Sequence, residues 1–192
     1  MNNPMGGYSP KELTIGVDSQ KKLLQGISMI SSAVKSTLGP MGQTVIIESP
    51  HHTHGMTVTK DGVTVAKSYD MADPVGNLAV KMMKEASART ATSAGDGTTT
   101  AIVLTEALVK QGLQKITGDV NKTEVLRHLA SETEGLVKSL KKESKKVTKK
   151  RLVDVATISA NNDKVIGKII SDCYNDVGKN GIVTVENSPT PD

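Results

Sequence analysis

Gly95-Asp96-Gly97-Thr98-Thr99-Thr100 is the stretch from which the fold and the site of this chain are best predicted. Its two glycines permit positive φ angles and a close approach of backbone to a ligand. The threonines precede a predicted helix, residues 101–112, whose first-turn N–H groups would attract phosphate. A plain glycine turn with a threonine N-cap is the alternative interpretation. One cap needs one hydroxyl, so the extra threonines favour phosphate binding.

The acid between the two glycines adds a metal ligand to this prediction. Mg²⁺ on nucleotide phosphates commonly takes only one or two protein carboxylates, and Asp96 supplies one. The chain contains no G-x-x-x-x-G-K-[ST] motif and no G-x-G-x-x-G fingerprint. The loop is therefore predicted to bind Mg-nucleotide by a route other than a Walker or Rossmann motif.

Composition limits the class of protein. The 192 residues include no Trp and no Phe, so the core must be aliphatic with Met as gap-filler. Residues 141–151 hold seven Lys or Arg without interleaved aromatics, which favours a solvated helix end over a nucleic-acid surface. The single Cys173 fits a reducing compartment. We find no secretory signal and no apolar run of ~20 residues, so we expect a cytoplasmic protein without nucleic-acid or membrane partners.

The chain before the loop is predicted to form a strand, a helix and a hairpin. Residues 13–17 alternate as in a short strand, and Asp18 is a fair N-cap for the helix that Gly39-Pro40 must end. The apolar residues of this helix fall on one face: Leu23, Ile27, Ile30, Val34 and Leu38. Residues 44–48 and 56–59 are predicted to pair as a hairpin. Its tip carries His51, His52 and His54, whose spacing does not match a closed zinc site, so we interpret it as an exposed loop.

Two aspartates after the hairpin are predicted to start local structure: Asp61 a turn and Asp73 a helix. Lys60-Asp61-Gly62 is a turn signal, yet a Lys and an Asp beside bound phosphate would also supply a cation and a carboxylate that orients water. Asp73-Pro74 is a preferred helix start, and Val75, Ala79, Met82 and Ala86 are its predicted buried row. This helix is expected to run to about Ser93.

Helices dominate the rest of the chain. Residues 101–109 are apolar on most sides, which predicts a buried helix, with Gly112 as its cap. Asn121 and Glu124 suggest a capping box, with Val125, Leu129, Leu136 and Leu140 facing inward. Residues 152–160 and 165–177 are predicted as a helical pair joined by Asn161-Asn162-Asp163, with Ile166, Ile169, Ile170, Cys173 and Val177 on one face of the second. Gly178 should end that helix, and residues 182–186 are predicted as a strand.

Five ordered motifs together resemble the GroEL-type (group I) chaperonins, from about Asp18 to about Asn187. They are TLGP at 37–40, VTKDGV at 58–63, GDGTTTA at 95–101, TISAN at 157–161 with Asp163, and VGK at 177–179 with Gly181 and TVE at 184–186. The resemblance implies a mainly α fold with a small β-hairpin component. It further implies a chaperonin equatorial-domain helical bundle at 1–144, followed by a partial α/β intermediate domain at 145–192.

The resemblance also implies a function and a set of site residues. An ATPase subunit of this family binds ATP and Mg²⁺, with K⁺ as a further ion, and encloses non-native polypeptides in a homo-oligomeric, heptameric ring that a co-chaperonin lid can close. The nucleotide ligands would be Thr37, Leu38, Gly39, Pro40, Lys60, Asp96, Gly97, Thr98, Thr99 and Thr100, with Asp96 on the metal and Asp61 assisting hydrolysis. Asp163 matches a position in the helix that closes over the nucleotide pocket.

Three interpretations stay open on the sequence. Complete subunits of the family are far longer, with an apical domain and returning equatorial and intermediate segments, one of which carries a second catalytic aspartate. This chain is therefore expected to be the N-terminal part of a folding machine that has little activity alone. The alternative is a truncated, non-hydrolysing nucleotide-binding or regulatory module. An unrelated phosphotransferase with a convergent loop is the third interpretation.

Overall fold

The computed structural model describes residues 13–39, 41–48, 55–178, 181–184 and 186. Helices dominate these residues, and a small two-stranded antiparallel sheet accompanies them, which confirms the predicted fold class. The internal contacts divide the chain into two compact units, residues 1–122 and 123–192. The predicted domain limit at 144/145 stays a prediction.

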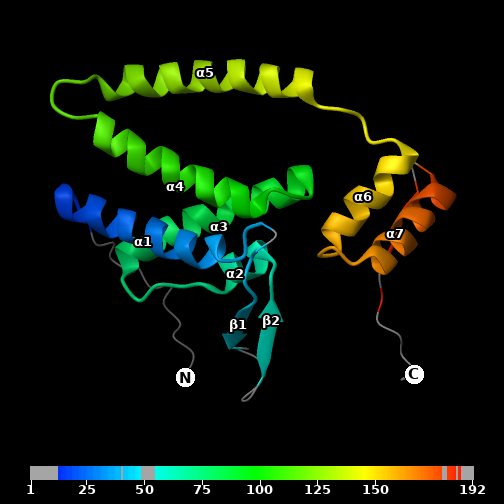
Figure 1. Cartoon of the computed structure of the whole chain (residues 1–192). Helices are drawn as coiled ribbons and strands as arrows, with labels where there is room; N and C mark the ends of the chain where they lie inside the picture. The colour runs from blue at the N-terminus through cyan, green and yellow to red at the C-terminus, as the bar shows by residue number, and fades with distance from the viewer. Residues whose placement is uncertain (1–12, 40, 49–54, 179–180, 185, 187–192) are drawn as a thin grey trace, which may run out of the picture. The chain divides into compact units, whose positions relative to one another are not determined.

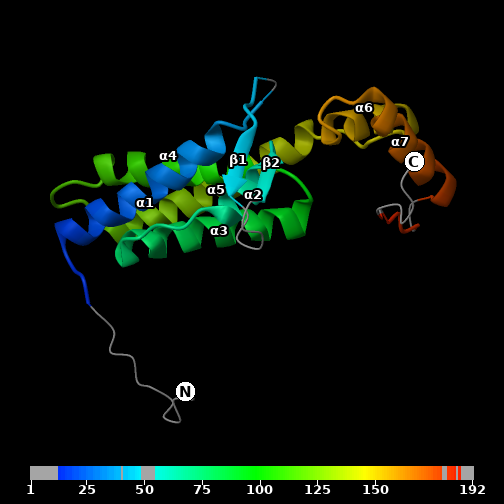
Figure 2. The ribbon, with the colours of Figure 1, turned by 90° about the horizontal axis from the view of Figure 1, so that it is seen from below.

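Three long helices build the first unit: α1 (Val17–Lys35), α3 (Pro74–Ala94) and α4 (Thr98–Lys115). Each contacts the other two, and Figures 1 and 2 show them running alongside one another. The short helix α2 (Gly62–Ser68) contacts all three. Their shared core is aliphatic, as the composition requires: Ile30, Val34, Val65, Ala66, Val80, Met83 and Ile102.

Local sequence signals explain where α3 begins and why it lies close to α1. Asp73 caps α3 by accepting a hydrogen bond from the backbone N of Gly76 at 2.6 Å, and Pro74 occupies the first turn, as predicted. A Cβ on Gly26 of α1 would overlap the backbone oxygen of Gly76. The two helix backbones therefore approach at a point where only glycine fits.

The predicted hairpin is confirmed by β1 (Val45–Glu48) and β2 (Met56–Thr59), which pair with Val45 opposite Thr59 and Glu48 opposite Met56. Val45 and Ile47 pack against the core of the first unit, whereas Ile46 between them is exposed. This alternation follows from the period of two in a strand. The histidine-rich tip lies outside the described residues.

The second unit consists of α5 (Lys122–Glu143, whose first residue belongs to the first unit), α6 (Lys149–Ser159) and α7 (Lys164–Val177). The predicted pairing of the last two helices is confirmed, and Figure 1 shows them side by side. Asn161 and Asn162 adopt positive φ angles of 55° and 66°, and Asp163 caps α7 through the backbone N of Val165 at 2.8 Å.

Several predicted boundaries are wrong. Residues 13–17 form no strand; Leu13 and Ile15 are 90% and 84% exposed, and α1 begins at Val17 rather than after Asp18. The first helix ends at Lys35, before Gly39. Residues 13–17 form no strand because, among the described residues, they have no neighbouring strand to exchange backbone hydrogen bonds with. The first helix ends before Gly39-Pro40 because the residues after Lys35 form turn hydrogen bonds instead.

Several predicted buried faces are also wrong. On α3 the predicted Ala79 is buried, but Met82 is 70% exposed and its neighbour Met83 is buried instead. The apolar α4 buries Ile102 and Glu106 only, and leaves Leu104 and Leu108 exposed. The residues predicted to face inward on α5 are exposed in part or in full: Val125, Leu129, Leu136 and Leu140. The residues predicted to share one face of α7 are also exposed in part or in full: Ile166, Ile169, Ile170, Cys173 and Val177. Residues 181–184 and 186 form no strand. Periodicity identifies an apolar face, but a neighbouring element must cover it.

Candidate functional site

The loop between α3 and α4 has the backbone that its glycines predict. Gly95 ends α3 at φ 74°, and Gly97 precedes α4 at φ 84°, both in the left-handed region. Helix α4 begins at Thr98, three residues before the predicted start at Ala101. The three threonines are therefore the first turn of α4 and not a loop ahead of it.

This first turn presents backbone donors. The N–H of Ala101 donates to the carbonyl of Gly97 at 2.9 Å, so the N–H groups of Thr98, Thr99 and Thr100 precede the first intrahelical bond. Gly97 itself has no side chain with which to cap them. Asp96 is exposed, and its Oδ1 accepts from the N–H of Gly97 at 2.6 Å. An acid beside open helix donors suits a magnesium-bound phosphate chain.

Asp61 is the N-cap of α2, a helix that the sequence reasoning missed. Its Oδ2 accepts from the backbone N of Thr64 at 2.9 Å and from the Thr64 hydroxyl at 2.6 Å, and its Oδ1 accepts from Val63 N at 3.3 Å. Partial burial raises the pKa of Asp61, but these hydrogen bonds and the charge of Lys67 outweigh it, so the pKa lies below its ordinary value of 3.8. The carboxylate is ionised at neutral pH.

A close contact joins the turn at Asp61 to the first turn of α4. A Cβ on Gly62 would overlap the hydroxyl of Thr99 and would lie 3.2 Å from Thr99 Cβ and 3.3 Å from Val34 Cγ1. Only glycine fits here, and it is buried. The sequence segments 60–62 and 98–100, which lie 35 residues or more apart, are thus in contact beside the end of α1.

The turn after α1 is held by its own backbone. The N–H of Gly42 donates to the Gly39 carbonyl at 2.9 Å, and the N–H of Gln43 donates to the Ser36 carbonyl at 2.6 Å. Thr37 Oγ1 donates to the Val34 carbonyl at 2.8 Å, while Leu38 is exposed. Of the other predicted ligands, Lys60 is exposed and Pro40 lies outside the described residues.

Glu106 is a charged residue that the sequence reasoning did not single out. It lies in the middle of α4, is 3% exposed, and forms ion pairs with Lys35 of α1 and with Lys110 at 2.7 Å. Burial raises the pKa of Glu106, but the hydrogen bonds and charges of Lys110 and Lys35 outweigh it and leave the pKa below 4.5. A lone acid among the apolar residues 101–109, four residues before a lysine, was the available signal.

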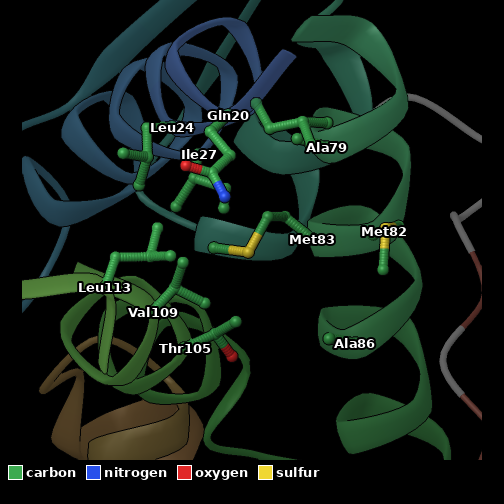
Figure 3. Close-up of a pocket in the computed structure, with 11 residues that line it drawn as sticks. Gln20, Leu24, Ile27, Ala79, Met82, Met83, Ala86, Thr105, Val109 and Leu113 are labelled. Carbon is green, nitrogen blue, oxygen red and sulfur yellow. The ribbon is translucent and has the colours of Figure 1, made fainter. Parts of the chain in front are cut away.

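The first unit also contains a cavity, and its lining is apolar, unlike the polar and charged residues of the predicted site. It measures about 420 Å³ and opens between α1, α3 and α4. Figure 3 shows Leu24, Ile27, Met83, Val109 and Leu113 around it, and none of the predicted site residues lines it. Such a lining does not suit a triphosphate.

Among the described residues, no group of three or more His, Cys, Asp or Glu side chains could hold a metal ion by itself. A single carboxylate such as Asp96 fits an ion that is held mainly by substrate phosphates and water. None of the helices that the structure describes is both long and apolar enough to cross a membrane.

Comparison with known proteins agrees with this arrangement of elements. Residues 30–189 match the model of the TCP-1/cpn60 chaperonin family. The chain belongs to this family. The chaperonin resemblance that the motifs carried is thereby confirmed.

Solved chaperonin structures share the fold of this chaperonin chain. Two crystal structures of the chaperonin gp146 from the bacteriophage EL 2 (Pseudomonas aeruginosa), both in the presence of ATP-BeFx, are 33% and 32% identical, with TM-scores of 0.72 and 0.71. Each match covers 84% of this chain and 28% of the phage protein. A group III chaperonin in the open state is 26% identical, with a TM-score of 0.66, over 82% of this chain and 31% of its own. This chain therefore spans less than a third of the length of these relatives.

Proposed function

We propose that this chaperonin chain binds Mg-ATP at the start of α4 and supplies part of the nucleotide site of a protein-folding ATPase. The observation that carries the proposal is the contact between Gly62 and Thr99, which brings the Asp61 turn to the open first turn of α4. The ATP-BeFx present with the phage chaperonin gp146 supports a nucleotide at this fold. The carboxylate and helix donors described above fit such a ligand.

Each group has a distinct role in the proposed site. The N–H groups of Thr98–Thr100 donate to phosphate oxygens, and Asp96 binds Mg²⁺, which when bound neutralises phosphate charge. Lys60 and the turn 37–40 add a cation and backbone contacts. Asp61 is ionised and can orient the attacking water.

We propose a GroEL-type subunit with equatorial residues 1–144 and intermediate residues 145–192 that forms a heptameric cytoplasmic ring. The ring would enclose non-native polypeptide under a lid protein, with ATP hydrolysis driving the cycle and K⁺ as a further ion. The chaperonin relatives support a large assembly of this kind.

A second candidate is a nucleotide-binding module that does not hydrolyse ATP. It is favoured by the Asp61 carboxylate, which already accepts hydrogen bonds from Val63 and Thr64. A chain that forms small oligomers and binds ATP without turnover would support it. A large ring with ATPase activity would support the folding machine.

Calorimetric titration of the 192-residue chain with ATP, with and without Mg²⁺, tests the proposal. We expect binding that depends on Mg²⁺ and that weakens more than about tenfold in Asp96→Ala, since even outer-shell partners of a metal are worth 10–100-fold. Asp119→Ala, which removes an exposed aspartate from the turn after α4, is the matched control and should bind as the wild type. Equal affinity in the wild type and Asp96→Ala would refute the metal role.

A further inference from the structure

The buried Glu106 carboxylate has no role in the nucleotide contacts proposed above. Its two oxygens are divided between two cations: Oε2 accepts from Lys35 Nζ, and Oε1 accepts from Lys110 Nζ at 2.7 Å. The glutamate side chain is 4% exposed, whereas each lysine side chain is 44% exposed. A charge so buried is costly unless it is paired, and the two lysines provide that pairing.

The two lysines differ in what they connect. Lys110 lies on the same helix as Glu106, four residues later, so that ion pair joins α4 to itself. Lys35 is the last residue of α1, so its ion pair joins two helices. The Glu106–Lys35 pair is thus the cross-link, and Lys110 supplies a hydrogen bond to the second carboxylate oxygen.

The cross-link joins the two helices, α1 and α4, that carry proposed nucleotide ligands at the end of one and the start of the other. Lys35 is followed within two residues by the turn 37–39, and α4 opens with Thr98–Thr100. Glu106 lies eight residues after Thr98, or about 12 Å along a rigid helix. Val34, the neighbour of Lys35, packs close to Gly62 at the contact with Thr99.

We propose that Glu106 is a positioning residue for the nucleotide: it holds Lys35, and through Lys35 the turn 37–39, at a fixed place relative to the first turn of α4. The inference rests on the proposed function, because it concerns the same nucleotide. Glu106 touches no phosphate itself. It keeps the turn 37–39 and the first turn of α4 in a fixed relative position. This lowers the entropic cost of ordering the two segments when the nucleotide binds.

The first test measures the turn without nucleotide. Amide hydrogen exchange at Gln43, whose N–H closes the turn on Ser36, should be about tenfold faster in Lys35→Met and in Glu106→Gln than in the wild type. Lys110→Met keeps the cross-link and should leave this rate unchanged. The amide of Ile30, in the buried middle of α1, reports global stability and should change less than that of Gln43 in Lys35→Met and in Glu106→Gln.

The second test measures Mg-ATP affinity in the same variants. Lys35→Met and Glu106→Gln should each weaken binding severalfold, and the double variant should be no weaker than the worse single one, because both remove one interaction. Lys35→Arg keeps the cation and should restore binding. Lys110→Met should bind as the wild type.

The outcomes separate this inference from the proposed function. A wild-type chain that binds no Mg-ATP would overturn the proposed function and the nucleotide role of Glu106 with it. Wild-type binding together with an unchanged Gln43 exchange rate in Lys35→Met would overturn this inference alone. Equal losses of affinity in Lys110→Met and Lys35→Met would also overturn it, since the cross-link would then have no special role.

Discussion

At the scale of single residues, Asp61 and Asp96 differ in what their carboxylates already bind. Asp61 accepts two backbone and one hydroxyl hydrogen bond as the cap of α2, whereas Asp96 is exposed and accepts from the adjacent Gly97 N–H. A carboxylate has about four acceptor positions, so Asp61 can cap a helix and still orient water. The observed cap and the proposed contact with water can be separated by substitution.

Asp61→Ala and Asp61→Asn should have different effects on stability. Alanine removes the cap of α2 and should lower the free energy of unfolding by about 1 kcal/mol, while asparagine is a good N-cap and should lower it far less. Both should slow ATP turnover in the assembled protein with little change in Mg-ATP affinity. Urea unfolding, calorimetry and an ATPase assay measure the three quantities. Full turnover in Asp61→Asn would contradict the role of Asp61 in orienting water.

Glu106 should make the chain sensitive to acid. Because its pKa in the folded chain lies below 4.5, its stabilisation is complete above pH 4.5 and is lost as the pH falls through the folded pKa. Asp61 and Asp73, whose pKa values lie below 3.8, act in the same direction at lower pH. Urea unfolding from pH 7 to 3 should therefore show a smaller loss of stability in Glu106→Gln than in the wild type below pH 4.5. Parallel curves would contradict the ion pairing of Glu106.

At the scale of elements, the site depends on how closely α2 approaches the start of α4. The approach is set by Gly62, which leaves room for the Thr99 side chain, and by Val34 beside it. Interiors pack too densely to absorb an added methyl group here without a shift of Thr99. The geometry of the first turn of α4 is thus tied to a residue outside it.

Gly62→Ala should weaken Mg-ATP binding and destabilise the chain by about 1–3 kcal/mol, because the new methyl group displaces Thr99. Gly112→Ala is the matched control: it lies within α4, its Cβ would meet no atom within 4 Å, and it should stabilise the chain by about 0.5–1 kcal/mol. Chemical denaturation and calorimetry give both values. A neutral Gly62→Ala would show that Thr99 is not confined.

The elements that could be predicted from the sequence are those with strong local signals. Asp73-Pro74 starts α3, the pair of glycines takes positive φ, and Asn161–Asp163 joins α6 to α7. Helix α2 was missed because seven residues show too little periodicity and Asp61-Gly62 also signals a turn. Met82 and Met83 could not be distinguished, since only the position of α1 and α4 decides which one is buried.

At the scale of the whole molecule, the described residues leave much apolar surface exposed. Leu104 and Leu108 of α4 are 56% and 54% exposed, and an apolar cavity opens between α1, α3 and α4. The chain spans 28% of the phage chaperonin gp146 that it resembles. The sequence predicted the apolar faces, but which of them are covered depends on contacts between distant segments.

This surface should bind a hydrophobic dye in the native state. We expect the folded chain to enhance the fluorescence of ANS without denaturant, and the double variant Leu104→Gln, Leu108→Gln to enhance it less while remaining folded. Circular dichroism verifies the fold of both. An equal signal from the wild type and the variant would place the apolar surface elsewhere on the chain.

The most direct test of the central claim is a crystal structure of the chain with Mg²⁺ and a non-hydrolysable ATP analogue. We expect phosphate oxygens within hydrogen-bond distance of the N–H groups of Thr98–Thr100, and Mg²⁺ bound to Asp96. Nucleotide bound at another place, or Asp96 without an ion beside fully bound nucleotide, would contradict it.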